Sequence, residues 1–421
     1  MARRRCRSAT RGRPFERLKT THTATDAAVT KVFREEAGRL TAALMRVLGD
    51  FDLAEEVVQD SLVAALEKWP EQGIPDKPGA WLMTTARRRA IDVLRRDKRY
   101  REKLALLERS DMRTDRAEAD DRLRLIFTCC HPALSQEAQA ALTLRAVAGF
   151  TTAEIASAFL IAEATVAQRI VRAKRKIVHA NIPYRVPEGG EVADRLDGVL
   201  SVLYLMFNEG YLSRGAQAAM RRDLADDALW LAGLVDRLMP DQPEVIGLQA
   251  LMTLNLARSA ARFDEAGEMV LLPAQDRSLW NHIAIADGIA LVDRAGAMHA
   301  PGPYQLQAAI AALHSEARSW ADTDWHQIVV LYDALLGYVD SPIVRLNRAV
   351  ALGQFVGPEV ALGEVNDLAL ALSGYHLFHA TRAELLDQLG EPVLAREARR
   401  RALDLCQNPA ERSLLERKLR G

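Results

Sequence analysis

Cysteine, aromatic residues and long apolar runs are all scarce in this sequence of 421 residues. Its four cysteines have a spacing that fits no disulfide framework, which favours a reduced, cytoplasmic protein. No apolar run approaches the ~20 residues that span a membrane. The basic N-terminus lacks the apolar core of a secretory signal, so we expect residues 1–25 to form a basic disordered arm. No membrane partner is expected.

Motifs for chemistry are missing as well. The sequence has no glycine-rich phosphate or dinucleotide motif and no visible set of nucleophile, base and orienting residue. Asp322, Asp324 and His326 lie close together, but ordinary helix capping by Asp explains them better than catalysis. Cys129 and Cys130 in "FTCCHP" are adjacent rather than spaced for one zinc ion, which favours a buried position at a helix end. We predict no catalytic residue, no metal ion and no cofactor.

Charge is unevenly distributed although the formal net charge is zero. Residues 1–180 hold 34 basic and 24 acidic residues, a balance of +10, and residues 181–421 carry the compensating −10. This split indicates an N-terminal half that meets a polyanion and a C-terminal half that does not. Alanine is abundant and alternating runs of β-branched residues are hard to find, which predicts an all-α fold.

Two helical segments in the first hundred residues differ in charge. The segment "AEEVVQDSLVAALEKW" has apolar residues at helical spacing and an acidic opposite face. Its predicted inward stripe comprises Ala54, Val57, Val58, Ser61, Leu62, Ala65 and Leu66. After a loop over 71–80 rich in proline and glycine, an arginine-rich helix over 81–96 is predicted. Its inward positions are Leu82, Ala86, Ala90, Val93 and Leu94.

The stretch "TTAEIASAFLIAEATVAQRIVRAKRKI" at 151–177 reads as two short helices joined by a tight turn. Thr151 and Glu154 match the capping-box pattern at the start of the first helix. The second helix begins after Ala162, which offers no capping side chain; this costs roughly 0.5–2 kcal/mol, which apolar burial offsets. Its predicted buried stripe is Val166, Ile170, Ala173 and Ile177.

The exposed face of that second helix is strongly basic. It carries Thr165, Gln168, Arg169, Arg172, Arg175 and Lys176. A recognition helix offers N-terminal side chains to base edges while basic residues grip phosphate, and Gln and Arg suit adenine and guanine. Alone, however, the pair fits a solvated basic face on ordinary core helices equally well.

From about residue 190 the chain reads as acidic helices that end in an internal repeat. Helix-breaking points fall near Pro240, Pro273, 300–303, Pro342 and Pro358. At an offset of 34 residues, Arg348, Ala349, Leu352, Gln354, Pro358 and Ala361 match Arg382, Ala383, Leu386, Gln388, Pro392 and Ala395. This is the tetratricopeptide period, and small residues at fixed points allow paired helices to nest.

The basic helical units, taken in order, resemble bacterial RNA polymerase sigma factors of the extracytoplasmic-function type. The first two segments look like the sigma-2 domain and the stretch at 151–177 looks like sigma-4. Downstream, "LIFTCCHPAL", "LYLMFNEGY", "QDRSLWN", "GPYQLQAAIAALH", "TDWHQIVVLYDAL" and "SPIVRLNRAVALG" resemble the subgroup with a C-terminal tetratricopeptide-like domain. The resemblance spans residues 27–420.

The resemblance implies partners and residue roles. The acidic helix 52–69 resembles the segment that docks on the clamp helices of the polymerase β′ subunit, and the implied partner is the polymerase core with its β′ and β subunits. Its implied polymerase contacts are Glu55, Glu56, Gln59, Asp60 and Leu62. The implied contacts to the −10 element of promoter DNA are Arg87, Arg88, Arg95 and Arg96, with Asn usual in the family where Arg88 stands. The implied contacts to the −35 element are Thr165, Gln168, Arg169, Arg172, Arg175 and Lys176. Trp81 is expected to be a core anchor rather than a stacking platform.

The expected organisation is a sigma factor regulated by its own C-terminal domain, where a regulatory protein could also bind. The expected segments are an arm at 1–25, sigma-2 at 26–98, a linker at 99–120, sigma-4 at 121–180 and a repeat domain at 181–421. The alternatives are a regulator that fuses a helix-turn-helix to a repeat sensor, which leaves 52–96 unexplained, and an enzyme in the C-terminal half.

Overall fold

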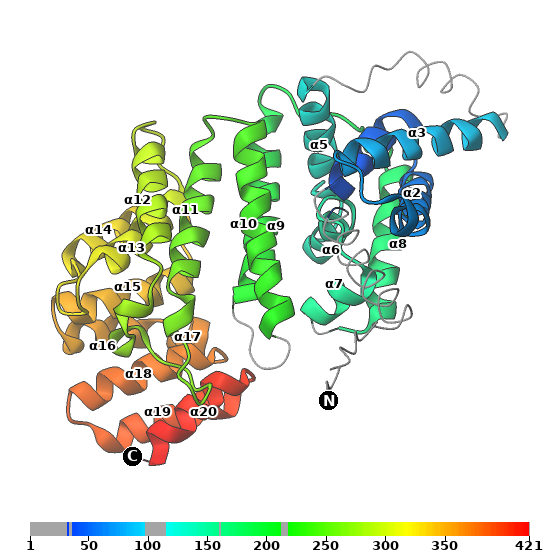
Figure 1. Ribbon diagram of the computed structural model, residues 1–421. Coiled ribbons are helices and arrows are strands. Elements are labelled where there is room, and N and C mark those ends of the chain that lie inside the picture. The colour runs from blue at the N-terminus through cyan, green and yellow to red at the C-terminus, as the bar shows by residue number, and fades with distance from the viewer. Residues whose placement is uncertain (1–31, 33–35, 97–114, 160, 212–217, 421) are drawn as a thin grey trace, which may run out of the picture. The chain divides into compact units, whose positions relative to one another are not determined.

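The computed structural model describes residues 32, 36–96, 115–159, 161–211 and 218–420 (Figure 1). Within these ranges the chain is helical, with an isolated bridge between Phe263 and Met269 and no strand, so the all-α prediction is confirmed. No helix in these ranges is both long and apolar enough to cross a membrane. The predicted arm and most of the predicted linker lie outside the described residues.

Two compact units divide the chain at Val202 and Leu203. The first contains a helix over 36–48, α2 (Phe51–Gln72), α3 (Pro78–Arg96), α5 (Asp115–Cys129), α6 (Gln136–Ala146), α7 (Thr152–Phe159), α8 (Glu163–His179) and the first half of α9 (Glu191–Tyr211). The second contains the rest of α9, α10 (Ala218–Leu238), α11 (Pro243–Ala257), α12 (His282–Gly296), α13 (Pro303–Glu316), α14 (Trp325–Leu336), α15 (Pro342–Phe355), α16 (Pro358–Asp367), α17 (Ala369–Leu372), α18 (His376–Gln388), α19 (Pro392–Leu405) and α20 (Pro409–Arg420).

Local signals fix where α2 begins and what it buries. The Asp50 carboxylate caps α2 by accepting hydrogen bonds from the backbone N–H groups of Asp52 and Leu53, at 2.9 and 3.1 Å. The inward stripe continues through Trp69, which is 2% exposed, whereas Leu66 is 41% exposed. The prediction for Leu66 is therefore wrong. The indole of Trp69 packs edge-on against that of Trp81 in α3, with ring centroids 5.5 Å apart.

The pair α7 and α8 has the predicted geometry. Thr151 N–H donates to the Glu154 carboxylate at 2.7 Å, and Glu154 N–H donates back to Thr151 Oγ1 at 3.1 Å. This reciprocal pair is the capping box. Ala162 occupies the N-cap of α8 without a side-chain hydrogen bond, as expected. Burial of the stripe Val166, Ile170, Ala173 and Ile177 against the rest of the unit holds α8 in place.

Prolines start many helices of the second unit. Pro303, Pro342 and Pro358 each occupy the first turn of a helix, where the missing N–H costs nothing and the fixed φ suits the helix. Helices α15 and α16 begin 34 residues before α18 and α19, so the period found in the sequence is also a period of the structure. The matched small residues are buried in the helix packing, with Ala349, Ala361 and Ala395 at 0% exposure and Ala383 at 1%.

The last helix is tied back to an earlier loop of the same unit. Ser413 Oγ donates to the Glu268 carboxylate at 2.6 Å, and the Arg417 guanidinium donates to Met269 O at 3.2 Å. Glu268 lies in the segment between α11 and α12, 145 residues before Ser413. Helix α20 therefore contacts a segment of the same unit that lies far from it in the sequence.

Replacing Ala395 with Leu is expected to destabilise the second unit by about 1–3 kcal/mol, because the extra carbons enter a filled interface between α18 and α19. Chemical denaturation of the full chain, followed by circular dichroism, measures the effect. The exposed Ala369→Leu serves as the matched control. Equal stability of the two variants would contradict close packing at the repeated alanine.

Candidate nucleic-acid interface

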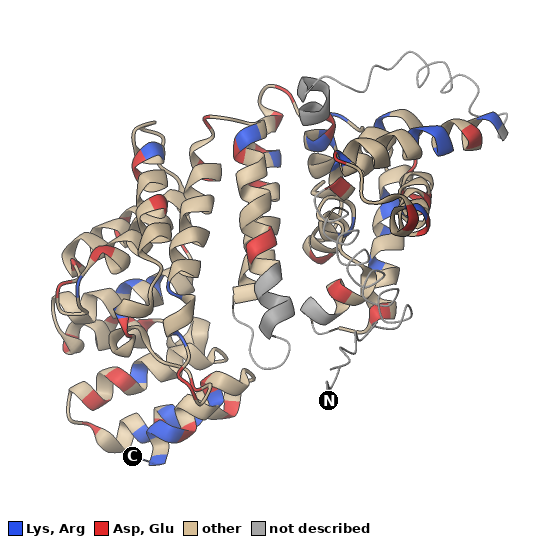
Figure 2. Ribbon diagram, in the orientation of Figure 1, with Lys and Arg blue, Asp and Glu red and all other residues tan. Residues whose placement is uncertain are grey.

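Helix α8 presents a polar and basic face opposite its buried stripe. Thr165, Gln168 and Arg172 are exposed, and Arg169 is half-buried. One turn further on, Arg175 and Lys176 are exposed as well. The basic residues along α8 can be followed in Figure 2. The face thus combines an amide near the helix N-terminus with cations beyond it, the composition that major-groove reading requires.

Helix α3 carries a second group of arginines. Its apolar side is sealed by Leu82, Ala86, Ala90 and Leu94, all at 0% exposure. Arg88 and Arg95 are exposed and Arg87 is half-buried, while the side chain of Arg96 lies outside the described residues. Figure 2 shows the basic residues recurring along the outer end of α3. Cations in this arrangement suit the phosphates of a nucleic-acid strand.

The acidic helix α2 is only partly open. Glu56 and Gln59 are exposed, and Leu62 is half-buried. Asp60 is engaged by Arg89 of α3, whose guanidinium lies 2.8 Å from the Asp60 carboxylate. Glu55 is also engaged, so the predicted contact face divides into exposed and occupied positions.

The partner of Glu55 comes from the helix-turn-helix. Lys174 of α8 is 8% exposed, and its Nζ lies 2.8 Å from Asp52 Oδ1 and 3.1 Å from Glu55 Oε2. Arg145 of α6 also approaches Glu55, at 3.7 Å. Sequence reasoning missed Lys174, because a lysine within a basic run looks like a solvated residue and its acidic partners lie more than a hundred positions away.

Backbone packing joins the same two parts of the first unit. A Cβ added to Gly38 would lie 2.2 Å from the carbonyl oxygen of Val147. The helix over 36–48 therefore approaches the end of α6 so closely that only glycine fits at position 38. Tyr184 Oη lies 3.0 Å from Ala42 O and 3.2 Å from Asp121 O. The regions that resemble sigma-2 and sigma-4 are thus packed against each other.

The other candidate groups have structural roles. Cys129 and Cys130 are buried at the end of α5, as interpreted from the sequence. Burial raises the pKa of the Cys130 thiol to about 11, so it stays protonated at neutral pH. The Asp324 carboxylate caps α14 by accepting from Gln327 N–H at 2.9 Å, which confirms the capping interpretation.

Comparison with known proteins assigns the class to which this arrangement belongs. Residues 32–100 match the family model for sigma-70 region 2, and residues 124–177 match that for sigma-70 region 4. Residues 195–296 match a family of unknown function. No solved structure matches the chain.

Individual relatives agree with the family models. The chain is 32% identical to the ECF RNA polymerase sigma factor SigL of Mycobacterium tuberculosis over 152 residues, 35% of this chain and 84% of the relative. It is 43% identical to an uncharacterized protein of Rhizobium meliloti over 387 residues, 90% of this chain and 92% of the relative. The chain belongs to the sigma-70 family of RNA polymerase sigma factors. Its function at this level is promoter-directed transcription initiation, with core polymerase and promoter DNA as partners.

Membership of the sigma-70 family accounts for α2 and α3, which the alternative of a one-component regulator left without a role. A regulator built on a helix-turn-helix alone gives no role to α2 and α3, whereas the region 2 match covers both helices. The proteins of this family act by binding rather than by catalysis.

Proposed function

We propose that the chain binds the polymerase core through α2, opens the −10 element with α3 and contacts the −35 element with α8. The observation that carries this proposal is the polar face of α8, because its apolar stripe is buried and its amide and arginines remain outward. Thr165, Gln168 and Arg169 lie in the first two turns of α8, and Gln168 and Arg169 would contact bases. Arg172, Arg175 and Lys176 would contact phosphates.

The arginines of α3 would act during strand separation. Arg87, Arg88, Arg95 and Arg96 would bind the backbone of the non-template strand, and the side chain of Arg88 takes the place of a base-reading Asn in the family. Opening a promoter requires unpaired bases to be captured while a basic groove follows the backbone. No bond would be made or broken by the chain itself, so it would act as a binding factor and not as an enzyme. Its place of action would be the cytoplasm.

In vitro transcription with purified core polymerase tests the proposal. The full chain should direct specific initiation on some fragments of a library of genomic DNA, and core polymerase alone should not. If no fragment supports specific initiation, the proposal is wrong. Copurification with core polymerase provides a second, DNA-independent measurement.

We also propose that the packed first unit is a closed form, which must open for polymerase to bind. Lys174 and Arg145 occupy Glu55, which is one of the polymerase contacts implied for α2. Polymerase and the helix-turn-helix would then compete for the same carboxylate. Closure would keep a free sigma factor away from polymerase until another event separates the two parts.

The C-terminal helices are proposed to regulate this step. Truncation after Val202 removes the second unit while keeping Arg195, whose guanidinium donates to Phe127 O at 2.5 Å within the first unit. We expect promoter output to change by about fivefold or more, since coupling between sites is typically worth 1–3 kcal/mol. Runoff transcription at equal concentrations of full and truncated chain measures the change. Equal output would argue against a regulatory second unit.

A further inference from the structure

Three side chains of different chemistry converge in the second unit. His376 begins α18, Cys406 follows the last residue of α19, and Glu411 lies in the first turn of α20. One ligand atom from each lies within 4.8 Å of the other two. His376 Nε2 is 2.9 Å from Glu411 Oε2, and Cys406 Sγ is 3.8 Å from the same oxygen.

We propose that His376, Cys406 and Glu411 bind a zinc ion. Thiolate, imidazole and carboxylate are the donors that zinc takes in proteins, at about 2.3, 2.0–2.1 and 2.0–2.2 Å. Tetrahedral angles at those bond lengths place N and O about 3.4 Å apart and S and O about 3.6 Å apart. The two observed separations differ from these values by about 0.5 and about 0.2 Å, which small side-chain rotations supply.

The turn between α19 and α20 fixes two of the three ligands. The Asn408 side chain caps α20 by accepting from Ala410 N–H at 2.9 Å, which sets Glu411 in the first turn. Arg412 donates to Leu403 O at 2.8 Å and to Cys406 O at 2.9 Å, which holds the chain around the thiol. Preorganised ligands lower the entropy cost of binding an ion.

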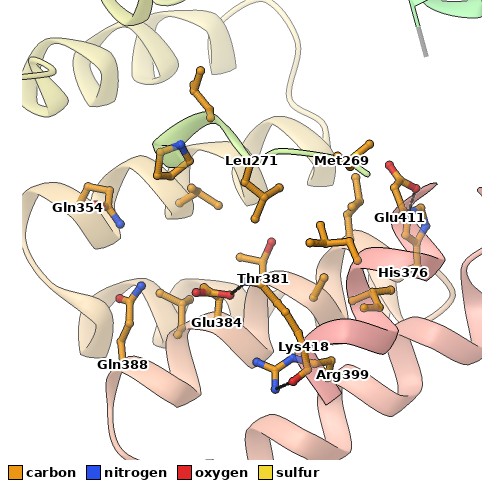
Figure 3. Close-up of a pocket in the computed structure, with 18 of the residues that line it drawn as sticks. Met269, Leu271, Gln354, His376, Thr381, Glu384, Gln388, Arg399, Glu411 and Lys418 are labelled. Carbon is orange, nitrogen blue, oxygen red and sulfur yellow. Dashed lines mark hydrogen bonds and ion pairs between the residues drawn. The ribbon is translucent and has the colours of Figure 1, made fainter. Parts of the chain in front are cut away.

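The third ligand comes from the neighbouring helix and faces a cavity. His376 and Glu411 lie next to each other at one end of a mainly apolar cavity of about 540 Å³ (Figure 3). Cys406 is 3% exposed and is not one of the residues that line the cavity. A zinc ion with three protein ligands keeps a fourth position for an exogenous ligand. Two of these ligands line the cavity, so a small molecule with an anionic donor group could reach the ion from there.

Sequence reasoning predicted no metal site and had no signal for this one. Cys406 and Glu411 are five residues apart, and His376 lies thirty residues before the cysteine, which matches no zinc spacing. Without an ion the same groups form a hydrogen-bonded pair beside a thiol that donates to Asn408 O at 3.6 Å.

Cobalt substitution in the full chain distinguishes the two interpretations. After removal of metals with a chelator, one equivalent of Co²⁺ should produce a thiolate-to-metal charge-transfer band and the visible bands of tetrahedral cobalt. Added Zn²⁺ should abolish both. Cys406→Ser should remove the charge-transfer band, and His376→Gln and Glu411→Gln should weaken zinc binding at least about tenfold.

Two controls guard against misfolding and adventitious binding. Cys6→Ser removes a thiol elsewhere in the chain and should leave the cobalt spectrum unchanged. Zinc should raise the melting temperature of the parent chain more than that of Cys406→Ser or Glu411→Gln, each compared with its own chelated protein. A cobalt spectrum without charge transfer, or one equally strong in Cys406→Ser, would overturn the proposal and leave only the hydrogen-bonded pair.

Discussion

Replacing both Arg169 and Arg172 with Ala is expected to weaken binding of the holoenzyme to a promoter duplex by at least about tenfold at physiological salt. Both residues lie on the outward side of α8, and each is proposed to neutralise a phosphate or contact a base. Each lost phosphate contact also reduces the magnitude of the slope of log affinity against log salt by about 0.9. The slope of the double variant should therefore be shallower than that of the parent by up to about two. Fluorescence anisotropy over a salt series measures both quantities.

A matched pair on another helix controls for the loss of charge. Arg396 and Arg400 of α19 are exposed and one turn apart, and their replacement by Ala removes the same two charges from the second unit. This control should bind promoter DNA as the parent does. If both double variants lose the same affinity, general electrostatics rather than the α8 face accounts for binding.

Gln168→Ala separates base reading from phosphate binding. An amide paired with adenine is worth about 1–3 kcal/mol of discrimination, so the variant should lose preference among promoter sequences while keeping its salt slope. Selection of bound sequences from a randomised −35 region measures this preference. An unchanged preference would place sequence reading on another residue.

The second large effect concerns the closed first unit. Lys174→Ala is expected to raise the affinity of the free chain for core polymerase by roughly tenfold, because loss of the lysine leaves Glu55 half-buried beside Arg145 alone. Weaker compensation of this half-buried carboxylate costs the closed form on the order of 1–3 kcal/mol, which favours the open form. Titration of labelled chain with core polymerase, without DNA, gives the affinity.

Gly38→Ala tests the same closure by steric means. The new Cβ would collide with Val147 O, which is a backbone atom and cannot rotate away. Both variants should therefore raise core affinity, although they touch different contacts. The exposed Lys176→Ala is the matched control and should leave core affinity unchanged. Unchanged affinity in both Lys174→Ala and Gly38→Ala would refute occlusion of α2.

Structural features that depend on residues close together in the sequence could be predicted from the sequence. Features that depend on contacts between distant residues could not. The capping box of α7, the bare N-cap at Ala162 and the buried stripe of α8 all depend on spacings of three or four residues. The 34-residue repeat is likewise visible because two successive helix pairs bury small residues at matched positions. In each case the physical cause lies within one or two turns of helix.

Lys174 and Leu66 mark the limit of that reasoning. Helical periodicity alone is compatible with either a buried or an exposed position for Lys174 and for Leu66. Contacts with other parts of the fold determine which position each side chain takes. Lys174 turns inward because two carboxylates of α2 compensate its burial. Leu66 turns outward because Trp69, three positions later, supplies the larger apolar surface at the α3 interface. The carboxylates that pair with Lys174 lie on another helix, and the packing of Trp69 against Trp81 of α3 likewise cannot be seen within α2 alone.

The return of α20 to Glu268 and Met269 has a consequence for how the second unit unfolds. An open array of helix pairs contacts only its nearest neighbours and frays from its ends, with exchange of amide hydrogens fastest in the last pair. Here the hydrogen bonds of Ser413 and Arg417 join the end of the array to a loop near its beginning. The terminal helix cannot then melt without loosening that loop. Amide hydrogens in α20 should therefore exchange together with those around 262–270, as one cooperative unit.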